Sequence, residues 1–234
     1  MLKKTIGIIG GMGPRATCDL MEKILSVSDA NSDQEYVRIC VDSNTNIPDR
    51  TKAILSGGED PLPEMVKSAV RLQDMGADLL MMPCNTAYFF YDRLRNFIDV
   101  PLLHMPRKTA EELKAERISC AAVLATDGVV QSGIYEKALE SCGIKTIYPE
   151  RESQKKIMDV IYHCIKAGKK DVEKYGLEQI SDSLFERGAQ KLILGCTELP
   201  IAFTMVGLTK NLIDPTKVAA KAALRFLHMP VRMD

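Results

Sequence analysis

The chain has 234 residues, enough to bury the core of one large domain or two small ones. Its hydrophobic share of 46% and charged share of 26% are typical of a globular protein. With 31 basic and 31 acidic residues its formal net charge is zero, which argues against a general nucleic-acid or membrane-surface binder, because such proteins usually carry a basic excess.

The termini and the cysteines indicate a cytoplasmic protein with free thiols. The short apolar run at the N-terminus leads into a Gly-rich turn at residues 10–14, not into a small-residue cleavage site. No apolar stretch has the length needed to cross a bilayer. The chain has seven cysteines without a Cys-x-x-Cys pair and three scattered histidines. We therefore expect neither a disulfide framework nor a metal site.

Short β-rich runs alternate along the chain with segments of helical periodicity. In the first half we expect strands at residues 5–10, 36–42 and 78–83, and helices at residues 16–27, 63–75 and 86–96. In the second half we expect strands at residues 118–125, 144–148 and 191–195, and helices at residues 129–142, 153–167, 172–187 and 214–227. This alternation predicts an α/β fold with parallel sheets covered by helices.

The two halves of the chain resemble each other. Cys84 and Cys196 each follow a Gly-Ala dipeptide and an apolar strand, and a Thr comes shortly after each. The two cysteines are 112 positions apart, and the first strands of the halves begin 113 positions apart, at Thr5 and Ile118. Unrelated βα units can share such a composition, but the matched order favours an internal duplication.

Both cysteines fall where a ligand site is expected. Ligands of open α/β sheets bind beyond the carboxyl ends of the strands, and each cysteine ends a predicted strand. Backbone N–H groups and the helix dipole at such a position favour a thiolate and a bound carboxylate, so the thiol pKa could approach neutrality. A buried cysteine is more often only a small hydrophobic residue, and we interpret Cys18, Cys40, Cys120, Cys142 and Cys164 in that way.

Two thiols on opposite faces of one carbon atom suit the inversion of its configuration. One thiolate removes the α-proton, and the other thiol returns a proton from the far side. If a pseudo-twofold axis relates the halves, Cys84 and Cys196 face each other across the cleft between them. The turn at residues 10–14 could also indicate a nucleotide loop, but it lacks both the Gly-x-Gly-x-x-Gly spacing and the P-loop lysine.

Three motifs, in this order, resemble the aspartate/glutamate racemase superfamily. They are residues 10–14 with Thr17, Pro83-Cys84-Asn85-Thr86-Ala87, and Gly195-Cys196-Thr197-Glu198-Leu199-Pro200. The resemblance implies two similar α/β domains, each a mostly parallel sheet flanked by helices, related by a pseudo-twofold axis with the active site in the cleft between them. It assigns residues 1–100 plus 208–234 to the first domain and residues 101–207 to the second. It also implies a homodimer and a mechanism without pyridoxal phosphate or any other cofactor.

Within the superfamily the match is closest to the aspartate racemases. Glu198 stands where glutamate racemases usually have His. Aspartate racemases use an Arg after the second strand and a Lys late in a helix of the second half, here matching Arg50 and Lys166. Either could instead be a surface charge. The family commonly has His where this chain has Tyr88, which could change the rate or the substrate range or could be a core aromatic residue.

The resemblance thus implies racemization of an acidic amino acid, with aspartate as the leading substrate and Cys84 and Cys196 as the catalytic pair. The substrate-binding residues that it implies, without any metal ligand, are Met12, Arg50, Asn85, Thr86, Thr126, Lys166, Thr197 and Glu198. The expected partner is a small amino acid, with no nucleic acid and no membrane. The alternatives are a glutamate or broad-specificity racemase, an isomerase of a related dicarboxylate, and a catalytically silent amino-acid-binding homologue. A Rossmann-type dehydrogenase is a more distant alternative, because its glycine fingerprint is incomplete.

Overall fold

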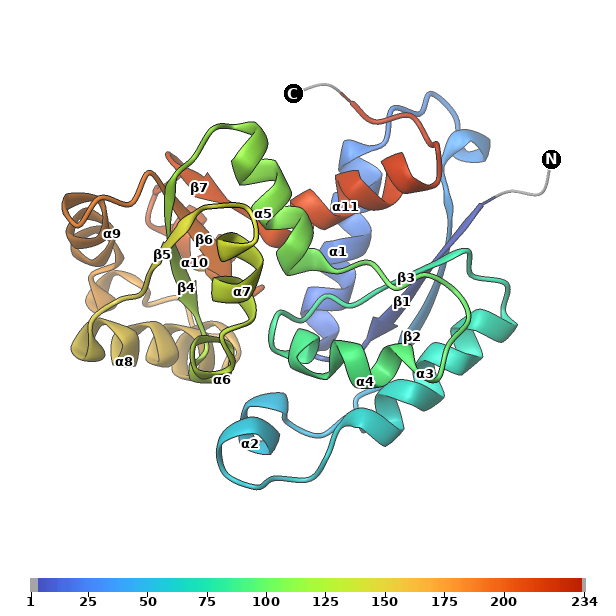
Figure 1. The fold of residues 1–234 in the computed structure, drawn as a ribbon, viewed down its shortest axis with the longest axis horizontal. Coiled ribbons are helices and arrows are strands. Elements are labelled where there is room, and N and C mark those ends of the chain that lie inside the picture. Colours follow the sequence, from blue (N-terminus) through green and yellow to red (C-terminus); the bar gives the residue numbers. More distant parts are fainter. Residues whose placement is uncertain (1–3, 233–234) are drawn as a thin grey trace. The chain divides into compact units, whose positions relative to one another are not determined.

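The computed structural model describes residues 4–232, and the chain divides into two compact units. Unit 1 comprises the chain up to Met105 and again from Thr216, and unit 2 comprises Pro106–Pro215. Each unit has its own sheet with helices packed on it (Figure 1).

Unit 1 is built on a parallel sheet whose strands follow the order β2-β1-β3. The strands are β1 (Thr5–Gly10), β2 (Arg38–Ser43) and β3 (Leu79–Met81). Its helices are α1 (Pro14–Val27), α2 (Arg50–Leu55), α3 (Leu62–Asp74), α4 (Tyr91–Arg95) and α11 (Pro215–Phe226), with single 3₁₀ turns at Asp33–Glu35 and Thr86–Phe90. Every residue of β1 is buried, as expected for the central strand of a parallel sheet with helices on it.

Unit 2 is built on a parallel sheet with the order β5-β4-β6-β7. The strands are β4 (Cys120–Ala125), β5 (Lys145–Ile147), β6 (Lys191–Gly195) and β7 (Leu212–Ile213). The helices are α5 (Met105–Ala115), α6 (Asp127–Ser132), α7 (Ile134–Glu140), α8 (Arg151–Asp159), α9 (Leu177–Glu186) and α10 (Leu199–Met205), with a π-helical turn at Val160–Ile165 and a 3₁₀ turn at Glu173–Tyr175. The α/β fold with two parallel sheets flanked by helices is confirmed.

The two sheets have equivalent topology. In each, the first strand of the half lies between the second and the third, and all pairings are parallel. A parallel bridge from Leu80 to Leu102 in unit 1 corresponds to the β6–β7 pairing in unit 2. Leu102 and β7 thus occupy the fourth strand position of their sheets. In both cases the helix that follows belongs to the other unit: α5 lies in unit 2 after Met105, and α11 lies in unit 1 from Thr216. This repetition agrees with the duplication inferred from the sequence.

The unit boundaries lie later than the expected ones after residues 100 and 207. Leu102 still pairs with Leu80 in unit 1, and β7 pairs with β6 in unit 2, so both segments stay with the sheet that they extend.

Several predicted helices differ in detail. The helix expected at residues 129–142 is divided into α6 and α7 by Gly133, whose φ of 64° is left-handed. The helix expected at residues 172–187 begins only at Leu177, after the left-handed Gly176. The helix expected at residues 86–96 starts as a 3₁₀ turn, and α2, α5, α10 and β7 were not predicted.

Candidate active site

The Gly-rich turn after β1 is fixed by close backbone packing. Gly11 has a φ of 83°, and a Cβ atom there would lie 2.3 Å from the backbone carbonyl of Asn44. The hydroxyl of Thr17, in α1, accepts a hydrogen bond from the Gly11 N–H and donates one to the Gly13 carbonyl, both at 3.0 Å. The motif therefore needs glycine at position 11 and a hydroxyl at position 17 to hold this turn.

Arg50 lies against the same turn. Its guanidinium donates to the carbonyl of Met12 at 3.2 Å, and to the carbonyls of Pro48 and Ile47 at 2.8 and 3.3 Å. Arg50 is the first residue of α2, which Asp49 caps by accepting from the Lys52 N–H at 2.8 Å. Two of the predicted binding residues, Met12 and Arg50, are thus in direct contact.

Cys84 follows β3 and precedes the 3₁₀ turn that begins at Thr86. Its side chain is buried, as are those of Asn85 and Thr86. The Cys84 carbonyl accepts a hydrogen bond from the Ala87 N–H at 3.2 Å, which starts the turn. Because β1 and β3 are neighbouring parallel strands, Cys84 leaves the sheet at the same edge as the Gly-rich turn.

Tyr88 is a core residue of unit 1. Its ring is buried, its hydroxyl donates to the Met82 carbonyl at 3.2 Å, and its ring centre lies 5.3 Å from that of His104. Burial raises the pKa of Tyr88 above its usual value, so the phenol stays protonated. Of the two interpretations left open by the sequence, this placement agrees with the core aromatic residue.

Cys196 lies between β6 and α10 and is hydrogen-bonded to a carboxylate. Its thiol donates to Glu198 Oε2 at 3.0 Å, and the Thr197 hydroxyl donates to the same oxygen at 3.0 Å. Burial and the Glu198 charge raise the pKa of Cys196 well above its usual 9.0, against the opposing effect of the Lys166 ammonium. The expectation that the environment brings this thiol towards neutrality was wrong, because it neglected the adjacent carboxylate and the burial.

Lys166 follows the π-helical turn. Its backbone N–H donates to the carbonyl of Ile161, five residues earlier, at 3.0 Å, and its Nζ lies 4.4 Å from the centre of the Tyr162 ring. The Lys166 charge is one of the three main influences on the pKa of Cys196, so the two side chains lie within electrostatic reach. π-Helical turns are rare and are frequent at functional sites.

The turn between β4 and α6 completes the carboxyl edge of the second sheet. Thr126 caps α6, and its hydroxyl oxygen accepts from the Val129 N–H at 3.4 Å. Gln154, on α8, donates from Nε2 to the Ala125 carbonyl at 3.0 Å and to Asp127 Oδ1 at 2.8 Å. Figure 1 shows α6 and α8 close together at this end of β4. Neither Asp127 nor Gln154 is among the site residues expected from the sequence.

The predicted site residues therefore form two sets, one in each unit. The unit-1 set contains the contact between Met12 and Arg50 and the buried segment of Cys84, Asn85 and Thr86. The unit-2 set contains Thr126, Lys166, Cys196, Thr197 and Glu198. Within residues 4–232, no three His, Cys, Asp or Glu side chains are grouped as a metal would require, and no helix has the length and apolarity needed to span a membrane.

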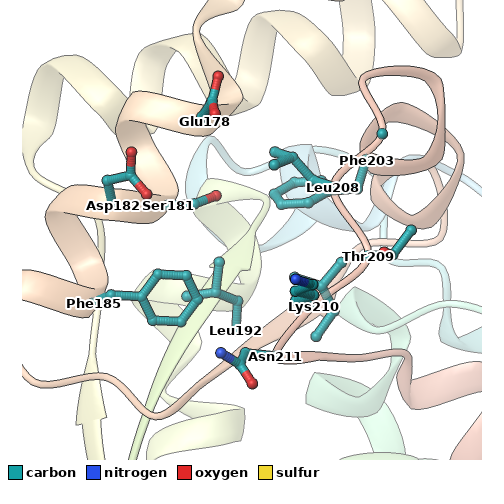
Figure 2. Close-up of a pocket in the computed structure, with 12 residues that line it drawn as sticks. Glu178, Ser181, Asp182, Phe185, Leu192, Phe203, Leu208, Thr209, Lys210 and Asn211 are labelled. Atoms are coloured by element: carbon teal, nitrogen blue, oxygen red, sulfur yellow. The ribbon is translucent and has the colours of Figure 1, made fainter.

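A cavity of about 200 Å³ in unit 2 lies away from these sets (Figure 2). Its lining is mainly apolar, from Phe185, Leu192, Phe203 and Leu208, with the acids Glu178 and Asp182 of α9 on one side and Lys210 on another. Leu192 is near the start of β6, whereas Cys196 follows the end of that strand, so the cavity opens at the opposite edge of the sheet.

Comparison with known proteins gives the family. Residues 9–223 match the model of the Asp/Glu/Hydantoin racemase family. The chain belongs to this family. This racemase-family chain is 26% identical to the broad-specificity amino-acid racemase RacX of Bacillus subtilis (strain 168), over 94% of this chain and 96% of that one.

Solved structures agree with this membership. Picrophilus torridus aspartate racemase matches with a TM-score of 0.85 and 29% identity, over 98% of this chain and 96% of that one. A glutamate racemase from Francisella tularensis subsp. tularensis SCHU S4 matches with a TM-score of 0.68 and 17% identity, over 97% and 81% of the two chains, and this likeness shows the fold alone. The resemblance read from the three sequence motifs is confirmed.

Proposed function

We propose that this chain is an amino-acid racemase that acts on aspartate without a cofactor, with Cys84 and Cys196 as the two acid/base groups. The observation that carries the proposal is the equivalent placement of the two thiols. Each follows the third strand of one of two topologically equivalent sheets, at the carboxyl edge where ligands of such folds bind. The relatives named as an aspartate racemase and a broad-specificity amino-acid racemase support the same activity.

The reaction needs one base and one acid on opposite sides of the α-carbon. One cysteine thiolate takes the α-proton, and the electron pair passes to the carboxylate to give an enediolate-like species. The other cysteine thiol then donates its proton to the opposite face, which leaves the second sulfur as the thiolate. We propose that Cys196 is the proton donor of the resting enzyme, because its pKa is raised well above the usual value.

Glu198 has a place in this proton transfer. Its carboxylate accepts hydrogen bonds from the Cys196 thiol and the Thr197 hydroxyl, so it is held towards the sulfur. We propose that Glu198 takes the proton when Cys196 must become the base, in place of the substrate contact expected from sequence.

The substrate contacts divide between the two sets. The proposal assigns the α-carboxylate and ammonium to Asn85, Thr86, Thr126 and Thr197, and the side-chain carboxylate to Arg50 and Lys166. The Arg50 guanidinium presents planar N–H donors that suit a carboxylate, and its bonds to Met12 and Pro48 hold it at the Gly-rich turn. We further propose that the protein is a cytoplasmic homodimer.

Three alternatives to an aspartate racemase are compatible with membership of this family. The match to a broad-specificity racemase over nearly the whole chain favours a wider substrate range as the second candidate function. A glutamate racemase or a silent amino-acid-binding homologue would share the same fold. A panel of amino acids separates the racemases by substrate, and tight binding without α-proton exchange identifies the binding protein.

The test is proton NMR of L-aspartate in D₂O with the purified protein and no pyridoxal phosphate, followed in parallel by circular dichroism. We expect the α-proton signal to disappear while the optical activity decays. No change with aspartate, glutamate or a mixed amino-acid pool would refute the racemase function.

A further inference from the structure

Asp127, the first residue of α6, carries a carboxylate that has no role in the scheme so far. Asp127 is half-buried, and its Oδ1 accepts a hydrogen bond from Gln154 Nε2 at 2.8 Å. Ala125 pairs with Gly195 in the sheet, so the chain leaves β4 at Thr126, directly before Asp127, and leaves β6 at Cys196 along the same edge. Asp127 therefore lies at the same edge of the sheet as the unit-2 set.

The amide orientation of Gln154 is fixed by its two acceptors. Its Nε2 donates to both the Ala125 carbonyl and Asp127, and a rotated amide would direct Oε1 at these same oxygens. In the observed orientation Oε1 is buried and accepts no hydrogen bond from the part of the chain that the structure describes. A buried unsatisfied oxygen destabilises the folded state. The hydrogen bond from Gln154 to Asp127 is thus kept although it lowers the stability of the folded state. This points to a role of this segment in ligand binding.

Charge decides which part of the substrate this carboxylate can take. An amino acid offers a carboxylate, which Asp127 repels, and an ammonium group, which it attracts and can bind by charge-assisted hydrogen bonds. Glu198, the carboxylate beside Cys196, already accepts hydrogen bonds from Cys196 and Thr197. Asp127 presents Oδ1 to Gln154, and a carboxylate can accept further hydrogen bonds on its two oxygens.

We propose that Asp127 receives the α-ammonium group of the substrate and that Gln154 is the residue that positions it. This inference rests on the proposed function and deepens it, because it adds a charged partner for the ammonium group to the amide and hydroxyl groups assigned above. The site takes free amino acids with a charged amino group. It discriminates against ring amides without an ammonium group, such as the hydantoins in the description of the family.

The test compares ligands that differ only in the ammonium group. Calorimetry gives the Kd of L-aspartate and of succinate for the wild type and for Asp127→Asn, which removes the charge but keeps an oxygen that can accept from Gln154 Nε2. We expect the Kd of L-aspartate to rise about ten- to hundredfold, as for the loss of a hydrogen bond to a charged group. The Kd of succinate should stay unchanged or fall. Asp182→Asn, on the exposed face of α9, is the control for net charge.

A second variant tests the positioning role. Gln154→Met keeps the side-chain length and removes the amide, so it should weaken L-aspartate binding less than Asp127→Asn does and leave succinate binding unchanged. If the turn had only a structural role, both variants would bind L-aspartate and succinate more weakly to the same extent. Thermal unfolding shows whether the variants fold.

The results separate this inference from the proposed function. If the wild type binds L-aspartate without racemizing it, the proposed activity fails while the comparison of ligands still tests Asp127. Equal effects of Asp127→Asn on L-aspartate and succinate, or none on L-aspartate, would overturn the inference. So would a wild type that binds neither L-aspartate nor L-glutamate, or that binds succinate and glutarate as tightly as these amino acids.

Discussion

The thiol of Cys196 donates a hydrogen bond to the carboxylate of Glu198 over 3.0 Å. Burial and this neighbouring charge together raise the pKa of the thiol, although Lys166 acts in the opposite direction. The unit-2 set therefore holds a protonated sulfur beside a carboxylate that can accept its proton. This relationship gives the first two predictions.

Replacing Glu198 should make Cys196 ionise at lower pH. Glu198→Gln removes the negative charge and keeps a polar side chain of the same size, so the pH profile of Cys196 alkylation should move to lower pH. Peptide mapping by mass spectrometry reads the labelling of Cys196 separately from that of the other cysteines. Cys84, in the other unit, serves as the internal reference. A profile that stays in place or moves upward would contradict the assigned cause of the raised pKa.

The raised pKa also predicts how stability depends on pH. The folded state keeps the Cys196 proton above pH 9.0, where the unfolded chain releases it. The stabilising contribution is therefore complete below pH 9.0 and is lost as the pH rises towards the folded-state pKa. Urea unfolding of the wild type and Cys196→Ser should show a steeper alkaline loss of stability in the wild type. Parallel curves for the two proteins would exclude this contribution.

Arg50 should determine the preference for acidic substrates. Arg50→Ala removes the planar donors at the Gly-rich turn, and we expect the KM for aspartate to rise about ten- to hundredfold. Arg50→Lys should recover only part of the loss, because lysine cannot bind a carboxylate in a bidentate way. Arg71→Ala is the matched control, since Arg71 is exposed and pairs with Asp42 at 3.4 Å. An unchanged preference for aspartate over neutral amino acids in Arg50→Ala would contradict the assignment.

Gly11, in the Gly-rich turn, and Gly76 form a matched pair that measures how much the close backbone packing at Gly11 affects the free energy of unfolding. Gly11 and Gly76 both have a φ of 83°, but only at Gly11 would a Cβ meet another backbone, at 2.3 Å from Asn44. Gly76→Ala should cost about 1–2 kcal/mol for the left-handed conformation. Gly11→Ala should cost about 1–3 kcal/mol more, because the Asn44 segment must move. Denaturant unfolding measures both, and equal losses would show that the packing at Gly11 is looser than described.

Tyr88 should matter for stability more than for catalysis. Tyr88→Phe leaves the Met82 carbonyl without its hydrogen bond and should lower the free energy of unfolding by about 1–3 kcal/mol, while kcat for racemization changes little. Tyr91→Phe removes the hydrogen bond that the half-buried Tyr91 hydroxyl donates to the Leu102 carbonyl at 3.0 Å, and it should cost less. A large fall in kcat at unchanged stability would instead assign the Tyr88 hydroxyl to the reaction.

The sequence could predict those features that local pattern determines. The buried apolar runs before Cys84 and Cys196 gave the strands, and the position of each cysteine at a strand end followed. The Gly133 and Gly176 interruptions carried a signal, since glycine often takes the left-handed conformation that ends a helix, but the helical periodicity around them concealed it.

The rest of the candidate site depends on tertiary structure. The π-helical turn before Lys166 has no local sequence pattern that distinguishes it from an α-helix. The contact of Gln154 with Asp127 joins residues on two different helices, so the sequence around neither residue predicts it. The direction of the Cys196 pKa shift depends on how the Glu198 side chain turns, which the motif Cys-Thr-Glu does not specify.

The most direct test of the central claim is α-proton exchange by the two cysteine variants. Cys84→Ser and Cys196→Ser are each incubated with L-aspartate and with D-aspartate in D₂O, and both exchange and inversion are followed by NMR and circular dichroism. The account predicts that each variant loses racemization by about a hundred- to ten-thousandfold, because each lacks one of the two proton-transfer groups. Full racemization by either variant would contradict the two-cysteine mechanism.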